Sequence, residues 1–134
     1  MNKDAHIRDF VIGDAAQIIR NPVTNIATGR ILDKAWFTLK LNRSDSDDEA
    51  VLQKVIGLSD PSGTNGIIVN GTGGTASVTF NIMSNDWTGV RAGVLYYHDV
   101  QVREVADMTL ENPMVFTIEV GDFVALAQVT RATT

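Results

Sequence analysis

Residues 93–105, GVLYYHDVQVREV, decide the fold, because they form the longest run of the chain that is dense in strand-forming residues. Successive side chains of a strand point to opposite faces, so the run separates into two sets. The more consistently apolar set is predicted to face a core: Val94, Tyr96, His98, Val100 and Val102. The other set is predicted to turn to water after its first two members: Leu95, Tyr97, Asp99, Gln101 and Arg103.

The predicted neighbour of this central strand is residues 35–42, AWFTLKLN, which alternates in the same way. Its two sets are Ala35, Phe37, Leu39 and Leu41 against Trp36, Thr38, Lys40 and Asn42. We expect the two strands to pair antiparallel and to anchor a half-buried sheet, because alternation of apolar and polar residues is typical of such sheets.

Short apolar runs separated by turn signals fill the rest of the chain. The cleanest period-2 alternation is TASVTFNI at residues 75–82. Further strands are expected at residues 10–19 (interrupted by Gly13-Asp14), 50–58, 67–69, 114–120 and 123–130, the last two joined in a tight hairpin by Gly121-Asp122. Loops are expected at residues 21–29, 43–49, 59–66, 70–74 and 107–113.

Two segments contain patterns that also fit a helical turn. Residues 50–58, AVLQKVIGL, fit a helix turn through Val51, Val55 and Leu58, or a strand through Val51, Gln53 and Val55; length and the β-branched residues favour the strand. Residues 84–87, SNDW, predict a short helical turn capped by Ser84, with Trp87 covering one end of the core.

Length and composition limit the alternatives. A chain of 134 residues, 44% apolar and 20% charged, predicts a single domain over residues 1–134 with its own core. About seven to nine short strands with no long helix predict an all-β fold, an antiparallel β-sandwich. The absence of cysteine from the sequence excludes disulfides, thiolate metal sites and a cysteine nucleophile.

Charge and hydropathy restrict the partners. With 16 acidic and 11 basic residues, the net charge of −5 argues against a nucleic-acid partner. The first ten residues, MNKDAHIRDF, lack an apolar signal region, and no apolar run approaches the roughly 20 residues of a membrane span. We therefore expect no nucleic acid, no membrane and no secretion through a signal peptide.

Three sequence patterns are candidates for a metal, phosphate or catalytic site, and each also has a purely structural explanation. Asp45, Asp47 and Glu49 alternate like calcium ligands, but the glycine and the later glutamate of such a loop are missing, which favours a solvated loop. Residues 71–74, GTGG, lack the lysine of a phosphate loop and predict a turn. His98 and Asp99 are neighbours on one strand, so they point to opposite faces, which favours a structural histidine. The sequence predicts no catalytic, metal or cofactor residues, no enzyme and no small-molecule substrate.

Four aromatic residues leave a second function open. Trp36, Trp87, Tyr96 and Tyr97 would line a sugar-binding face if they were exposed and coplanar, as in many β-sandwich lectins. The alternative is that at least three of them lie in the core. A carbohydrate-binding β-sandwich module is therefore the second hypothesis.

The order of features along the chain resembles the N-terminal immunoglobulin-like domain of phage baseplate upper proteins and related tail and fibre proteins. The matching pieces are Gly13-Asp14, WFTLK at 36–40, DSDDE at 45–49, AVLQK at 50–54, VTFNI at 78–82, Asp86, Gly93, Tyr96-Tyr97, DVQV at 99–102, Thr117, Gly121, Phe123-Val124 and VTR at 129–131. The likeness spans most of the chain, and the long glycine-rich segment at residues 61–74 departs from it.

The resemblance implies an immunoglobulin-like sandwich and no catalytic residues. It implies a non-enzymatic structural protein of a phage virion, assembled in the host cytoplasm, whose partners are other virion proteins. Family members continue into further domains, whereas this sequence stops at Thr134, so it resembles a small tail, baseplate or neck component or a capsid decoration protein.

The sequence also predicts assembly into a homo-oligomer or a lattice. The strands expected at residues 10–19 and 123–129 contain no lysine or proline, which natural monomers use to blunt sheet edges. If either lies at an edge, it is open to a neighbouring strand; the alternative is that both are internal or covered. Residues 1–9 and 132–134 are expected to be short flexible termini that order on assembly.

Overall fold

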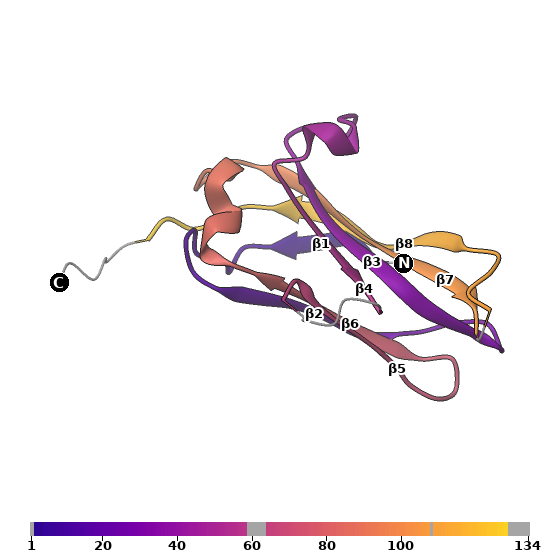
Figure 1. Ribbon diagram of the computed structural model, residues 1–134. Helices are drawn as coiled ribbons and strands as arrows, with labels where there is room; N and C mark the ends of the chain where they lie inside the picture. Colours follow the sequence, from indigo (N-terminus) through magenta and orange to yellow (C-terminus); the bar gives the residue numbers. More distant parts are fainter. Residues whose placement is uncertain (1, 59–63, 108, 129–134) are drawn as a thin grey trace.

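The computed structural model describes residues 2–58, 64–107 and 109–128. Within these residues, eight strands form two facing sheets, and two short 3₁₀ helices lie in the connections between strands (Figure 1). The strands are β1 (Asn2–Ile7), β2 (Ala16–Val23), β3 (Arg30–Lys40), β4 (Leu52–Gly57), β5 (Gly66–Asn70), β6 (Ala76–Ile82), β7 (Tyr96–Ala106) and β8 (Met114–Phe123); the helices are η1 (Asp47–Glu49) and η2 (Ser84–Gly89).

The larger sheet has the strand order β1-β8-β7-β3-β4, and the smaller sheet has the order β2-β6-β5. The predicted central strand is confirmed, because β7 lies in the middle of the larger sheet and pairs antiparallel with β3 and β8. Its predicted partner is confirmed too, with Phe37 opposite Val100. The second, fifth and sixth strands face the third, seventh and eighth, which is the distribution of an immunoglobulin-like β-sandwich.

The core lies between the two sheets and consists largely of the predicted inward-facing sets, but Leu41 lies beyond the end of β3 and is 48% exposed. Tyr96, His98, Val100 and Val102 of β7 are all buried. Across the gap, the alternation of β6 buries Val78, Phe80 and Ile82. The rings of Phe37 and Phe80 meet from opposite sheets with centroids 6.1 Å apart. Sheet packing of this kind, rather than local propensity, supplies most of the stability of a sandwich.

One end of the core is covered by η2, as the sequence predicts. Trp87 is 3% exposed, its ring centroid lies 6.2 Å from that of Phe123, and its indole N–H donates to the Asp14 carbonyl at 2.8 Å. The predicted cap is wrong: the helix begins after Met83, whose N–H donates to the Asp86 carboxylate at 2.7 Å. Asp86 can cap the helix because it is the third residue of the first turn (N3), and its side chain folds back to the N–H of Met83.

The segment at residues 50–58 contains the predicted strand, with the opposite register. Leu52, Lys54 and Ile56 point inward, whereas Gln53 points out and Val55 is partly covered. The side chain of Lys54 is 8% exposed, and its ammonium donates to Asp86 at 2.9 Å. A buried lysine is tolerated when it is paired, and this partner comes from η2, 32 residues further on.

The hairpin predicted at Gly121-Asp122 is wrong, because β8 continues through both residues. A two-residue hairpin turn needs a positive φ, which Gly121 does not have. Gly121 instead allows β1 to approach: a Cβ at this position would lie 1.8 Å from the carbonyl oxygen of Ala5. The glycine therefore marks a close contact between parallel strands rather than a turn.

A β-bulge in β8 changes which residues face the core. Val100 lies opposite Glu119 and Gln101 lies opposite Thr117, so Ile118 is the extra residue. The simple alternation predicted for residues 114–120 therefore fails after Ile118, and Glu119, rather than Val120, turns inward. Glu119 is 5% exposed, although the sequence alternation assigns it to solvent.

The termini and loops agree with the prediction only in part. The expected N-terminal arm at residues 1–9 is wrong for Asn2–Ile7, which forms β1 and pairs parallel with β8. The loops expected at residues 43–49 and 107–113 are confirmed for the described residues, with a short η1 turn inside the first. The loop expected at residues 70–74 begins only after Asn70, the last residue of β5, and the loop expected at residues 21–29 begins only after Val23, the last residue of β2. Residues 59–63, 129–131 and 132–134, on which further expectations fall, lie outside the described residues. No helix in the described part of the chain is long and apolar enough to cross a membrane.

Candidate functional site

A buried ionic cluster joins the two sheets at the side of the sandwich where β2 meets β8. The Nε and Nη2 of Arg20 each donate to one carboxylate oxygen of Glu119 at 2.7 Å, a bidentate pair. The Nε2 of His98 lies 2.8 Å from the same carboxylate. The side chains of His98, Glu119 and Arg20 are 0%, 7% and 29% exposed, so only the arginine reaches water.

The place of this cluster in the fold suggests its structural role. Near the start of β7, the hydroxyl of Tyr96 accepts the N–H of Arg91 at 2.9 Å, the arrangement of the tyrosine corner in immunoglobulin-like folds. In antibody domains, a cysteine two residues after this tyrosine forms the disulfide between the sheets. His98 occupies that position here. The chain has no cysteine, and its link between the sheets at this level is the ion pair from Glu119 to Arg20.

The cluster holds Glu119 as a carboxylate. Burial acts to raise the pKa of Glu119, but the hydrogen bonds from His98 and Arg20 outweigh it and lower the pKa from 4.5 to about 2. The carboxylate is therefore an acceptor, and we infer that the Nε2 of His98 carries the hydrogen. The Nδ1 of His98 has no hydrogen-bond partner among the described residues.

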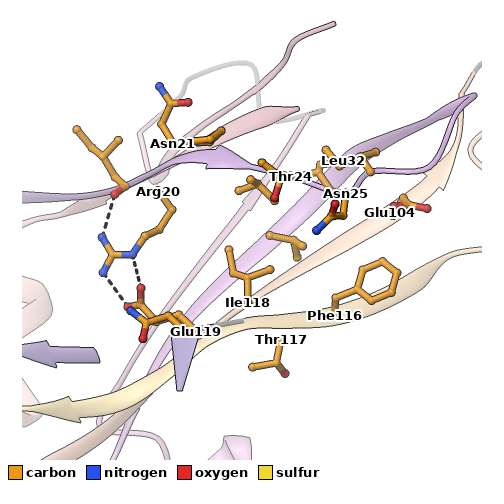
Figure 2. A pocket seen from close by; sticks show the side chains of 16 residues that line it. Arg20, Asn21, Thr24, Asn25, Leu32, Glu104, Phe116, Thr117, Ile118 and Glu119 are labelled. Atoms are coloured by element: carbon orange, nitrogen blue, oxygen red, sulfur yellow. Dashed lines mark hydrogen bonds and ion pairs between the residues drawn. The ribbon is translucent and has the colours of Figure 1, made fainter. Parts of the chain in front are cut away.

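A groove with a volume of about 580 Å³ runs beside the cluster, between β2 with its following segment and β8 (Figure 2). Its floor is formed by the side chains of Leu32 and Val102, both about 1% exposed. Phe116 and Ile118 line the β8 side, and Figure 2 shows both on the same side of the strand, with Thr117 on the other. The groove is thus an opening into the edge of the core.

The charged groups along the groove are paired with one another. Glu119 binds Arg20 at one end, and Glu104 is ion-paired with Arg30 towards the other end. Arg30 also donates to the main-chain carbonyls of Glu104 and Asn112. Such an arrangement presents apolar surface and paired ions, rather than the convergent titratable groups that an active site uses.

The outer face of the smaller sheet is a second unusual surface, here called the uncharged face. Ile19, Ile67 and Val69 are 51%, 56% and 51% exposed, and Ile19 and Ile67 flank Thr79 in register. No outward residue of this face is charged; its members are Gln17, Ile19, Ile67, Val69, Ser77, Thr79 and Asn81.

The outer face of the larger sheet has a different composition. Lys34, Lys40, Asp99 and Arg103 alternate with polar and aromatic residues there, which is typical of a surface in water. Arg103 binds Asp33 with N–O distances of 2.9 and 2.5 Å. The lack of outward charged residues is therefore a feature of the smaller sheet and not of the larger one.

The acidic loop, for which the sequence favours a solvated loop over a calcium site, uses its carboxylates in local contacts. Asp45 accepts the N–H of Asn42 at 3.1 Å, Asp47 binds Lys40 at 2.9 Å, and Glu49 accepts the N–H of Ser46 at 3.1 Å. No cluster of three or more metal-ligating side chains occurs among the described residues. The glycine run at residues 71–74 forms a turn in which Gly73 and Gly74 have φ values of 69° and 74°.

The His98-Asp99 pair behaves as strand geometry predicts, since the two side chains lie on opposite faces of β7. Asp99 lies partly buried on the outer face, and burial raises its pKa. His98 is packed against Phe37, with ring centroids 5.8 Å apart. His98 therefore lies inside the core, rather than at its edge as predicted.

The four aromatic residues do not form a shared platform. Trp87 and Tyr96 are each 3% exposed. Trp36 and Tyr97 are half-buried on the outer face of the larger sheet, and each ring has a cation over it: Lys34 at 5.5 Å from the Trp36 centroid and Arg43 at 4.5 Å from the Tyr97 centroid. A sugar ring would have to displace these cations, which disfavours the carbohydrate hypothesis.

Comparisons with known proteins assign no function to the chain. No protein-family model and no curated protein matches the chain. Among solved structures, it is similar to murine CRIg, an immunoglobulin-like domain, with a TM-score of 0.43 and 8% identity over 92% of each chain. A likeness at this identity concerns the fold alone, and the strand order described above stands independently of it.

Sequence reasoning missed Glu119 as the partner of His98, and Arg20 as the second partner of Glu119. The available signal was a charged residue at an inward position: Arg20 follows Ile18 by two residues on β2, and both face the smaller sheet's inner side. For Glu119 no comparable signal existed, because its inward orientation depends on the bulge at Ile118. The uncharged face was readable only once β2, β5 and β6 were known to share a sheet.

Proposed function

We propose that this chain is a non-enzymatic structural protein of a phage particle that binds other virion proteins. The resemblance of its ordered sequence features to the immunoglobulin-like domains of baseplate proteins supports a virion protein. The observation that carries the binding role is the uncharged face of the smaller sheet. Charged residues are depleted at the centres of protein interfaces, and exposed aliphatic side chains gain free energy when a partner covers them.

The sheet edge next to this face supports assembly into an oligomer or lattice. The strand expected at residues 10–19 includes the start of β2, and β2 pairs only with β6 in the described part of the chain. It is therefore an edge strand, as one of the two sequence alternatives has it. The strand runs over Ala16–Val23 rather than residues 10–19, however, and it contains Pro22, which the expected strand did not. The second expected edge is wrong: Phe123 lies between β1 and β7, and Ala125 and Leu126 form bridges to Ala92 and Val11.

Mass spectrometry of purified particles tests the proposal directly. Particles of the phage whose genome encodes this chain are expected to contain it at a fixed copy number relative to the major capsid protein. Immunogold labelling then distinguishes tail, neck and capsid positions. Complete absence of the chain from purified particles would overturn the proposal.

A matched pair of variants tests the uncharged face. Ile67→Lys places a charge on this face, on the edge strand β5, where Ile67 is 56% exposed, so the fold is expected to tolerate it. Incorporation into particles, measured by quantitative mass spectrometry after complementation in trans, is expected to fall roughly tenfold, since a buried charge at an interface costs more than 1.4 kcal/mol. Gln53→Lys adds the same charge to the exposed side of β4 in the larger sheet and is expected to leave incorporation unchanged. Equal incorporation of both variants would refute the assignment of this face.

A further inference from the structure

The edge of β8 is only half covered. β1 pairs with β8 from Glu119, opposite Asn2, to Phe123, opposite Ile7. At residues 114–118, no described strand lies on the side of β8 that faces away from β7. Alternate main-chain N–H and C=O groups of an edge strand point outward, so this stretch presents unpaired hydrogen-bonding groups.

Inward-facing apolar side chains at the same stretch remain exposed. Phe116 lies opposite Val102, which is 1% exposed, yet Phe116 itself is 40% exposed. Met114, two residues earlier on the same face, is 50% exposed. These side chains point towards the space between the sheets and are only partly covered by the described residues. Large inward-facing residues that stay exposed indicate a missing covering element.

The groove described above lies directly against this edge. Its volume of about 580 Å³ is within the roughly 300–1,000 Å³ of ligand pockets, and Asn2, the first residue of β1, belongs to its lining. The Glu119–Arg20 and Glu104–Arg30 pairs satisfy its ions internally. An occupant therefore has no charge to neutralise, which favours an uncharged one.

We propose that residues 114–118 of β8 accept an extended, uncharged segment of a neighbouring protein chain, which adds a strand in line with β1. Every second side chain of this segment is apolar and enters the groove beside Phe116 and Ile118. Main-chain hydrogen bonds to β8 supply affinity, and the groove supplies selectivity for the alternating pattern. The inference deepens the proposed function, because it states how a virion partner would be held.

The geometry favours a peptide over the other occupants. A small apolar molecule or a lipid tail would fill the groove but leave the main-chain groups of the edge unpaired. Two copies of this chain joined through their β8 edges would also pair those groups, and a test for self-association distinguishes that arrangement from peptide binding. A strand with alternating apolar side chains satisfies both features together.

Selection from a yeast-displayed library of random nonapeptides, with the whole chain as the target, tests the inference. Enriched peptides are expected to carry apolar residues at every second position and few charges. A synthetic copy of an enriched peptide is expected to protect the amides of residues 114–118 from hydrogen exchange. Peptides without this alternation, or protection confined to other strands, would overturn the proposal.

Two neighbouring substitutions on β8 provide the control. Phe116→Ser removes a groove-lining ring and is expected to weaken the peptide's Kd roughly tenfold or more, given the free energy of burying a phenylalanine. Val115→Ser alters a side chain that is 54% exposed on the same strand but outside the groove lining, and is expected to change Kd less than about threefold. Both residues are exposed, so both variants are expected to fold, which circular dichroism checks.

The outcomes separate this inference from the proposed function. Equal Kd values for the two variants, or displacement of the peptide by oleate alone with no amide protection, would refute strand addition. Self-association of the chain that is lost in Phe116→Ser, without peptide binding, would assign the edge to a second copy and would also refute it. None of these results depends on whether the chain is found in purified particles.

Discussion

Replacing Glu119 by glutamine is expected to lower the free energy of unfolding by about 3 kcal/mol, the low end of the range for removing one partner of a buried ion pair. Glutamine preserves the volume but removes the charge that Arg20 and His98 share. The low end applies because Arg20 is 29% exposed and keeps contact with water. Urea unfolding at pH 7 measures the loss.

A second ion pair gives the control. Asp47 binds Lys40 at 2.9 Å, but the Asp47 side chain is 69% exposed. Asp47→Asn is therefore expected to cost less than about 0.5 kcal/mol, as exposed pairs do. Similar losses in the Glu119 and Asp47 variants would contradict the view that Glu119 has a special role.

The loss of stability in Glu119→Gln is also expected to depend on pH. The pKa of Glu119 is lowered in the folded chain from 4.5 to about 2, so the unfolded chain binds this proton more readily. The stabilisation is therefore fully present above pH 4.5 and is lost as the pH falls towards 2. The difference in stability between wild type and Glu119→Gln is expected to shrink across this window. A difference that stays constant from pH 6 to pH 2.5 would show that the carboxylate is not held by Arg20 and His98.

Gly121→Ala is expected to detach β1 and to cost about 3 kcal/mol or more. The added Cβ would lie 1.8 Å from the carbonyl oxygen of Ala5 and 2.6 Å from its carbonyl carbon. Both atoms belong to the backbone, so no side-chain rotation relieves the contact. Hydrogen exchange is expected to show loss of protection in Asn2–Ile7, while β6 retains its protection.

Gly29→Ala separates this steric effect from backbone strain. Gly29 has a φ of +76° and no atom within 4 Å of an added Cβ. Its substitution is expected to cost about 1 kcal/mol through conformation alone, with β1 unchanged. If Gly121→Ala behaved like Gly29→Ala, the close approach of β1 to β8 would not hold in solution.

The sequence alone determined the strands whose alternation is unbroken. In β6 the apolar residues recur at every second position, and in β7 they do so apart from His98 and Glu104; a strand with one apolar face has only one way to bury it. Trp87 was placed correctly as a cover for the same reason, because a large apolar ring after a helical turn has to find a core. These elements sufficed to predict an antiparallel sandwich.

Tertiary structure decided every feature that depends on a neighbour distant in sequence. Gly121-Asp122 has the composition of a turn, and only the approach of β1 shows why the glycine is inside a strand. The bulge at Ile118 turns Glu119 inward, where Arg20 and His98 receive it from two other strands. The groove, the open edge of β8 and the uncharged face likewise arise from the sheet order. Local alternation indicates which side of a strand is apolar. Packing of the whole chain determines which strand pairs with each edge and which residues meet across the core.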